Sequence, residues 1–392
     1  PPETAQSPTV KAILLYQDLL RFHQNDPDPT ARLDIDLARL TWAWNTAFGE
    51  NKNARFKSAL KRFAEEQGDH ELASMALFTL ASVYKNENDL VEAHKLARRG
   101  LQAHPQSPGA KLCSNLISQI EAKSLAISTE RLWTSTPVTI RISYRNVTNV
   151  WFRLVPWDWD ELVARNQRPY EFIDDTQRAA LLAKKPFLSW SHQLPQTTNY
   201  QTATVEIPAP ANVSHGFYFL IASCNEEFSQ KDNQLSLTDI WVTDITFVVR
   251  PQPARIEGLV LEATSGEPIP NAKVEGWYPD QNDKRVAVQP CYTDTNGLFT
   301  LPTTDQRPLL LKITANGQSI ASRSEYWPAW GEPKAQPYQK TVFFTDRALY
   351  RPGQIIRYKG ICIDVDREHD SYRTLADTDV TVVLLDVNSK EV

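Results

Sequence analysis

The C-terminal part of the sequence contains the run TDRALYRPGQIIRYKGI at 345–361. Pro352 fixes its own φ and Gly353 tolerates a positive φ, so the pair predicts a tight turn that reverses the chain sharply between two strands. The segment 378–386 is the next predicted strand. We therefore expect the start of an antiparallel β-sandwich over 341–392.

The preceding segment, 254–338, has the spacing of a small antiparallel sandwich. IEGLV (256–260) predicts a first strand, SGEPIPNAKV (265–274) a tight connection and a second strand, and TDTNGLF (293–299) a hairpin and a third strand. Asn296-Gly297 is a hairpin turn that needs positive φ. Such a unit is expected to pack rather than to catalyse.

A larger β-rich region is expected over 128–250. Ile140, Ile142 and Tyr144 alternate with polar neighbours, which predicts a half-buried strand. Further strands are predicted from Val150 and at 202–207, 217–222 and 240–249, with a helical insertion at about 160–183. The region ends at Arg250-Pro251-Gln252-Pro253, which its composition marks as a stiff linker.

The first 127 residues have helical periodicity. Apolar residues recur at i, i+3, i+4 and i+7, and stop or capping residues interrupt them at 25–29, 48–51, 67–69, 85–89 and 104–108. Each apolar stripe needs a partner helix, so we expect six helices in three hairpins. An α-solenoid over 1–127 is the predicted architecture.

One part of this helical region, 77–105, resembles a tetratricopeptide repeat. The matching positions are the packing residues of the first helix, the small residues of the second and a closing proline: Leu77, Leu80, Ala81, Tyr84, Ala93, Ala97 and Pro105. Leu77 stands where Trp is typical and Ala97 where Phe is typical, and the flanking hairpins match weakly. The resemblance implies either a peptide-binding surface or a structural spacer.

Residues 345–361 closely resemble the motif that opens the second macroglobulin domain of the α2-macroglobulin family. The matching positions have structural roles and are Asp346, Arg347, Tyr350, Arg351, Pro352 and Gly353. The segment 254–338 is similar to carboxypeptidase-regulatory-like, transthyretin-like and macroglobulin domains. Together these resemblances imply a multidomain α plus all-β chain, with a tetratricopeptide-like solenoid followed by antiparallel Ig-like macroglobulin sandwiches. The order is similar to that of bacterial α2-macroglobulin-like proteins of the cell envelope.

The family's inhibitory elements have no counterpart in the sequence. Members carry a bait segment and often a Cys-Gly-Glu-Gln thioester, whereas Cys224 precedes Asn-Glu-Glu and Cys291 precedes Tyr-Thr-Asp. The last sandwich holds about half of its strands, since seven strands usually take about 100 residues. We therefore expect an N-terminal fragment of a larger protein. The start, Pro1-Pro2-Glu3-Thr4, has no initiator Met or signal peptide, so the targeting segment is expected to be missing.

Composition argues against several function classes. The 392 residues contain 42 Lys plus Arg against 47 Asp plus Glu, a net charge of −5, without the basic excess that nucleic-acid binding favours. No run approaches the roughly 20 apolar residues of a membrane span. His70-Glu71 lacks the second histidine of H-E-x-x-H because position 74 is Ser, and no nucleophile elbow, Walker loop or G-x-G-x-x-G occurs. No catalytic residue, cofactor or metal site is predicted.

Four other features have a functional and a structural interpretation, and we prefer the structural one for each. An acidic cluster could bind calcium or form a solvated loop, and a turn resembles half of an EF-hand loop. A tryptophan group could stack a ligand or pack in the core. The cysteines are expected to be buried lone thiols rather than two disulfides. The residues are, in that order, Asp364, Asp366, Glu368, His369 and Asp370; Asp294 and Asn296; Trp151, Trp157 and Trp159 with Asp158 and Asp160; and Cys113, Cys224, Cys291 and Cys362.

Three functional hypotheses follow. The first is a non-catalytic scaffold region of an α2-macroglobulin-like endopeptidase inhibitor of the bacterial periplasm or cell surface. Its partners would be proteases, through the full-length parent, and envelope proteins, through the helical array. The second is a cell-surface binding or adhesion protein without inhibition. The third, an enzyme, lacks a recognisable site.

Overall fold

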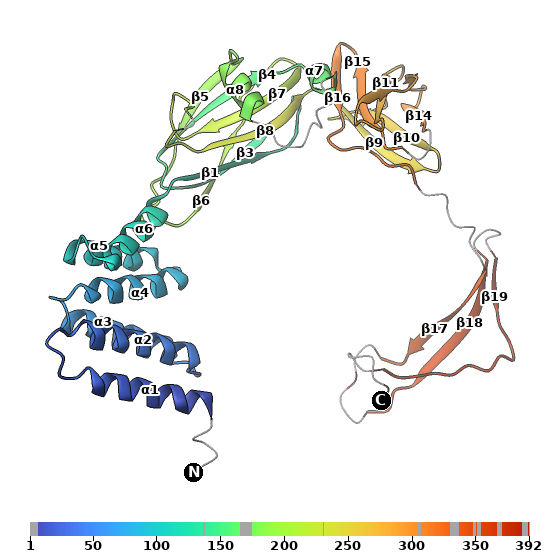
Figure 1. The fold of residues 1–392 in the computed structure, drawn as a ribbon. Helices are drawn as coiled ribbons and strands as arrows, with labels where there is room; N and C mark the ends of the chain where they lie inside the picture. Colours follow the sequence, from blue (N-terminus) through green and yellow to red (C-terminus); the bar gives the residue numbers. More distant parts are fainter. Residues whose placement is uncertain are drawn as a thin grey trace. The chain divides into compact units, whose positions relative to one another are not determined.

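The computed structural model describes residues 7–135, 138–164, 175–229, 231–303, 307–329, 337–347, 350, 354–366, 371–385 and 391 (Figure 1). In these residues the chain is α plus β, with eight helices and several sheets whose strands are almost all antiparallel. The chain forms two compact units, and the main boundary between them falls between Asp244 and Ile245. None of the helices in the described part combines the length and hydrophobicity that a bilayer span requires.

Six helices occupy the N-terminal part of the first unit, and their breaks coincide with the five predicted interruptions. The helices are α1 (Pro8–Phe22), α2 (Thr30–Thr46), α3 (Lys52–Glu66), α4 (Leu72–Asn86), α5 (Leu90–Ala103) and α6 (Pro108–Glu121). Local chemistry sets several of these starts. The Asp89 side chain accepts from the Glu92 N–H, and Ser107 accepts from the Ala110 N–H directly before Pro108 at the first turn of α6.

Small residues let the middle helices approach closely. Ala81 of α4 and Ala93 and Ala97 of α5 are fully buried in one core with Leu77 and Leu80. A Cβ on Gly109 would lie 2.4 Å from the Met75 backbone N, so α6 contacts α4 where only glycine fits. The tetratricopeptide assignment itself stays a prediction.

Two sheets follow in the first unit. One has the order β1-β3-β6, and the other β2-β8-β7-β4-β5, in which only the short β2–β8 pair among the described strands is parallel. The strands are β1 (Ser124–Thr129), β2 (Leu132–Trp133), β3 (Thr139–Arg145), β4 (Asn149–Pro156), β5 (Leu188–Gln193), β6 (Ala203–Pro208), β7 (Gly216–Ser223) and β8 (Leu235–Val242). Ile140 and Ile142 of β3 share a core with Phe152 of β4 and Leu220 of β7, so the two sheets pack face to face. The predicted insertion appears as α7 (Trp159–Ala164) and α8 (Asp175–Ala183).

A second pair of sheets lies in the second unit, with orders β14-β10-β9 and β12-β11-β15-β16, where β13 also pairs with β11. A Cβ on Gly276 of β11 would lie 3.4 Å from the Leu301 side chain of β14, which places the two sheets against each other. The strands are β9 (Ile245–Gln252), β10 (Arg255–Glu262), β11 (Lys273–Pro279), β12 (Arg285–Ala287), β13 (Cys291–Tyr292), β14 (Leu298–Pro302), β15 (Leu310–Ala315) and β16 (Gln318–Ala321).

The last sheet has the order β17-β18-β19, with β17 (Tyr338–Thr345), β18 (Tyr358–Asp366) and β19 (Ser371–Thr374). The chain reverses between the antiparallel strands β17 and β18, as predicted, while Pro352 and Gly353 of the predicted turn lie outside the described residues. The strand predicted at 378–386 does not form over 378–384, and Leu385 makes only an isolated antiparallel bridge with Glu391.

Three boundaries differ from the sequence predictions. Strand β1 begins at Ser124, before position 128 where the β-rich region was expected to start, because α6 already ends at Glu121. The single strand predicted at 240–249 is two strands, since the Thr243 N–H donates to the Trp133 carbonyl and the chain then passes to another sheet. The prediction of a linker at 250–253 is wrong for 250–252, because these residues belong to β9. Pro251 is tolerated there because β9 lies at the edge of its sheet.

The predicted hairpin at Asn296-Gly297 is partly correct. Gly297 has φ +74°, and the Asp294 carboxylate accepts the N–H groups of Asn296 and Leu298. The flanking strands pair with different partners, however, because β13 joins β11 and β14 joins β10. The turn therefore crosses between two sheets. The four-domain division at 1–127, 128–250, 254–338 and 341–392 stays a prediction.

Candidate functional site

The first ten residues of the predicted 345–361 motif, 345–354, lie at the end of β17 and in the loop that leads to β18, and their described members hold this loop closed. Its backbone extends the strand pairing, since the Asp346 N–H donates to the Arg357 carbonyl at 3.0 Å. The Asp346 Oδ1 atom accepts from the Arg357 N–H at 3.1 Å and also from the Tyr350 hydroxyl. The Arg347 N–H donates to the same hydroxyl oxygen at 3.1 Å. Three motif residues thus act together to hold the ends of the loop.

The electrostatics of this loop agree with a structural role for Asp346. The pKa of its carboxyl is lowered, chiefly by the hydrogen bond from Tyr350, which together with the weaker effect of the Arg357 backbone N–H outweighs the opposing effect of desolvation. Arg347 Nε lies 3.7 Å from Asp346 Oδ2. The Asp346 carboxylate is therefore a charged acceptor whose hydrogen bonds come from donors of the same loop, Tyr350 and Arg357. Arg351, Pro352 and Gly353 lie outside the described residues.

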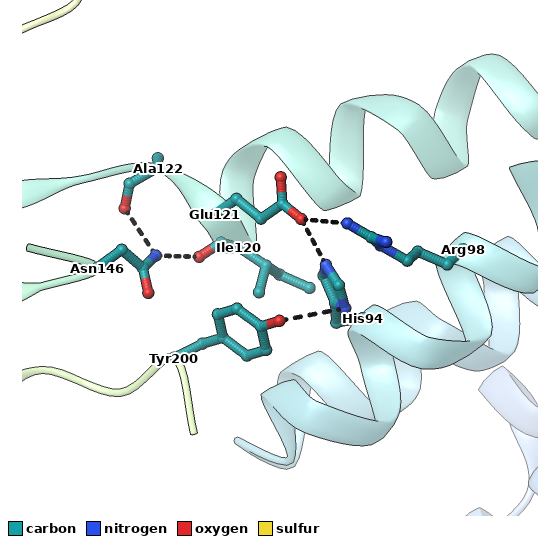
Figure 2. A network of polar contacts seen from close by, with 7 residues as sticks. All are labelled: His94, Arg98, Ile120, Glu121, Ala122, Asn146 and Tyr200. Atoms are coloured by element: carbon teal, nitrogen blue, oxygen red, sulfur yellow. Dashed lines mark hydrogen bonds and ion pairs between the residues drawn. The ribbon is translucent and has the colours of Figure 1, made fainter. Parts of the chain in front are cut away.

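A second polar group joins the helices to the first pair of sheets (Figure 2). His94 and Arg98 extend from α5 toward Glu121 at the end of α6. His94 Nε2 is 2.7 Å and Arg98 Nη2 is 3.1 Å from the same Glu121 Oε1 atom. Tyr200, in the connection from β5 to β6, lies against the imidazole with ring centroids 4.8 Å apart. Its hydroxyl is 3.4 Å from His94 Nδ1.

Hydrogen-bond chemistry assigns the roles in this group. A carboxylate can only accept, so Nε2 of a neutral His94 carries the proton and Nδ1 accepts from Tyr200. The pKa of Glu121 is lowered, first by His94 and then by Arg98. His94 is buried while Glu121 is partly exposed, so solvent screens the pair.

Asn146 completes the junction from the turn between β3 and β4. Its side-chain amide donates to the Ile120 carbonyl at 2.7 Å and to the Ala122 carbonyl at 3.2 Å, which terminates α6 on the sheet (Figure 2). The sequence analysis did not identify this group. Its members are 27 and 106 residues apart along the chain, so no local motif could have revealed it.

The residues considered for catalysis or metal binding have structural surroundings. His70 Nδ1 accepts from the Leu72 N–H, and Nε2 lies 3.0 Å from Thr30 Oγ1, which ties α4 to α2. Trp159 is buried and packs near Trp241, and the Lys184 ammonium lies 4.2 Å from the Trp157 ring centroid. In the part of the chain that the structure describes, no three His, Cys, Asp or Glu side chains gather as metal ligands would.

The remaining predicted features are only partly described. Asp364 and Asp366 lie on β18 rather than in a loop, and Glu368, His369 and Asp370 lie outside the described residues. All four cysteines are unpaired, as predicted, but Cys291 and Cys362 are half-buried rather than buried. Burial raises the pKa of the Cys113 thiol to about 11, which makes it a poor nucleophile.

Comparison with known proteins returned structural neighbours alone. No family model and no curated protein matches the chain. The neighbours include native α2-macroglobulin of Escherichia coli spanning MG0-NIE-MG1, with TM-score 0.40 and 15% identity over 51% of this chain and 64% of that one. A NIE-MG1 fragment of the same protein has TM-score 0.37 and 14% identity, over 51% and 96%. A mutant of Salmonella α2-macroglobulin has TM-score 0.24 and 11% identity, over 69% and 20%.

These neighbours are thus bacterial α2-macroglobulins or their fragments, at low identity and with partial coverage. The chain spans 64% of the length of the MG0-NIE-MG1 fragment.

Proposed function

We propose that the chain is the N-terminal scaffold region of an α2-macroglobulin-like endopeptidase inhibitor of the bacterial cell envelope. Its role is non-catalytic. The sheets contribute to the framework of a protease trap, and the tetratricopeptide-like helices serve attachment or recognition. Proteases are the partners of the longer protein, which acts in the periplasm or at the cell surface.

The observation that carries this proposal is the 345–354 motif together with the contacts of its described residues. The described residues of the motif, Asp346, Arg347 and Tyr350, form one hydrogen-bonded closure of the β17–β18 loop. A motif that holds a strand connection in shape suits a framework domain. The junction at His94, Glu121 and Asn146 supports the same role, because it joins the helices to the sheets through defined hydrogen bonds.

The test uses the complete reading frame that contains these residues. The purified protein is mixed with a broad-specificity endopeptidase, and hydrolysis of casein and of a small chromogenic peptide is followed in parallel. A trap that is cut and then encloses the enzyme should block casein cleavage while peptide cleavage continues. The 392-residue chain alone is the matched control and should block neither. Its mass should also be unchanged by methylamine, because its sequence contains no thioester motif.

Three outcomes would overturn the proposal, and the first two concern the complete protein. The complete protein could remain uncut in excess protease, or it could be cut without loss of casein turnover. Either result would favour the surface-binding hypothesis. Inhibition by the 392-residue chain alone would also contradict the scaffold role, since it would place inhibitory chemistry within these residues.

A further inference from the structure

A hollow of about 400 Å³ lies between the end of α2 and the start of α3. Its apolar lining includes Leu40 and Trp44 of α2 and Phe56 of α3. Phe56 is buried, and Trp44 stacks on it with ring centroids 4.9 Å apart and an interplanar angle of 7°. The Trp44 Nε1–H donates to Asn53 Oδ1 at 2.8 Å. This stacking and hydrogen bond fix the orientation of the indole, so the apolar surface is preformed.

Two cationic side chains line the same hollow. The Lys52 ammonium lies 5.6 Å from the centroid of the Trp44 ring. Arg55 is exposed, and its guanidinium makes no hydrogen bond or ion pair with the described part of the chain. It also lines an adjoining hollow of about 560 Å³ together with Arg62. Glu50 is the acidic residue of the first lining, so cations outnumber anions around it.

The positive charge here stands out against the whole chain. Helix α3 has the sequence KNARFKSALKRFAEE, with five Lys or Arg residues against two Glu. The chain as a whole carries a net charge of −5. The first turn of α3 contains no acidic residue, and its N-terminus adds a partial positive charge on the same side as Lys52. The site is therefore locally complementary to anions.

An exposed aromatic residue borders the hollow. Phe48, in the connection between α2 and α3, is 96% exposed and belongs to the lining. Gly49 beside it has φ +102°, and a Cβ there would meet no atom within 4 Å. An aromatic ring left in water at a preformed apolar hollow is a feature of protein-interaction surfaces.

We propose that the α2–α3 hollow binds an acidic peptide segment that carries one aromatic side chain. The aromatic ring occupies the space over Trp44 and Phe56 and is covered by Phe48. Neighbouring carboxylates pair with Arg55 and Lys52. A peptide suits this site better than a nucleic acid, because the hollow combines an apolar floor with two cations rather than an extended row of phosphate-binding groups. The inference concerns the helices alone and does not depend on protease inhibition.

The test measures fluorescence anisotropy of a labelled peptide with one phenylalanine between two pairs of glutamates, titrated with the 392-residue chain at low ionic strength. We expect saturable binding that added salt weakens. Arg55→Glu should reduce affinity about tenfold or more, because attraction becomes repulsion. Phe48→Ala should also reduce it, and this side chain is too exposed to affect folding. Lys61→Glu is the matched control: it makes the same charge change on an exposed position of α3 outside both linings and should leave affinity within about twofold.

A second peptide tests whether the hollow is specific for an aromatic side chain. The same peptide with alanine in place of phenylalanine should bind at least about tenfold more weakly. The proposal fails if the phenylalanine peptide does not bind, if Arg55→Glu has no effect, or if Lys61→Glu weakens binding equally. It also fails if single-stranded DNA or vesicles of anionic phospholipid displace the peptide at lower concentration than unlabelled peptide does. Such displacement would assign the surface to a nucleic acid or a membrane instead.

Discussion

The sheets of the first unit and the terminal sheet β17–β19 both contain strands with large apolar side chains but differ in how far these are buried. In the first unit Phe152 is 0% exposed and lies in a core shared by two sheets. In the terminal sheet Phe343 is 50% exposed, and Phe344 is exposed to a similar extent. The β4–β7 pair of the first unit and the β17–β18 pair of the terminal sheet both form continuous antiparallel ladders. Strand pairing alone therefore does not bury the side chains.

This difference shows what a second layer contributes. Backbone hydrogen bonds form within one sheet, whereas removal of apolar surface from water needs an opposing surface. Ile140 and Leu220 supply opposing surfaces to each other's sheets in the first unit. Most large apolar residues in the described part of 338–385 are exposed, Val380 and Leu384 among them, although Val365 of β18 is buried. Four substitutions test this contrast: three change contacts in the first unit, and one changes the loop of the terminal sheet.

The largest effect is expected from Phe152→Ala. Phe152 is fully buried and stacks on Trp190 with centroids 4.9 Å apart, so truncation should lower the free energy of unfolding of the first unit by about 3–5 kcal/mol. Phe343→Ala is the matched control and should cost under about 1 kcal/mol, because half of that ring is already in water. Urea unfolding followed by hydrogen exchange in β4 and β18 would measure each region separately. Equal losses would contradict the contrast.

Gly109→Ala should have the next largest effect. The added Cβ would lie 2.4 Å from the Met75 backbone N, so α6 must move away from α4 at a cost of about 1–3 kcal/mol. Gly68→Ala is the control, since its Cβ would meet nothing closer than 3.7 Å and should change stability by less than about 0.5 kcal/mol. Thermal unfolding followed by far-ultraviolet circular dichroism distinguishes the two. A Gly109→Ala protein as stable as the native chain would show that the helices adjust without strain.

Glu121→Gln should reduce the pH dependence of the helix–sheet junction. The folded pKa of Glu121 lies below its ordinary value of 4.5, first because of His94 and then because of Arg98. Its contribution to stability is therefore present above about pH 4.5 and disappears as the pH falls through the lower folded pKa. Solvent exposure limits the contribution to about 0.5 kcal/mol. Urea midpoints measured from pH 6 down to pH 3 should fall less in the variant, whereas Glu65→Gln should follow the native curve.

Asp346→Ala should have the smallest effect and act only locally. The change removes the acceptor of the Arg357 N–H and the Tyr350 hydroxyl, so the Arg357 amide should exchange its hydrogen a few-fold faster. Overall stability should hardly change, because the carboxylate is at the surface. Asp379→Ala should leave that exchange rate unaltered. Unchanged exchange in Asp346→Ala would show that the backbone pairing of 346 with 357 holds the loop by itself.

The helices were the part most accessible to sequence reasoning. Their apolar period and their end signals, such as Asp89 before α5 and Ser107-Pro108 at α6, act within a few residues. The loop reversal after 345 was also predictable, because strand ends and turn residues lie close together in the chain. The closure of that loop by Asp346 and Tyr350 was not predicted in detail. It depends on which groups meet across the loop, such as the Asp346 carboxylate and the Arg357 N–H, which are eleven positions apart in the sequence.

The sequence by itself determined the helices, most strands and the alternation of their faces, since these follow from local periodicity and turn chemistry. The tertiary structure decided which sheet each strand joins. It divided 240–249 at Thr243, made Pro251 part of an edge strand and left 378–384 outside any strand. It also brought His94, Glu121 and Tyr200 together. The physical reason is that sheet membership and long-range polar contacts depend on partners distant in the chain, whose positions local patterns do not specify.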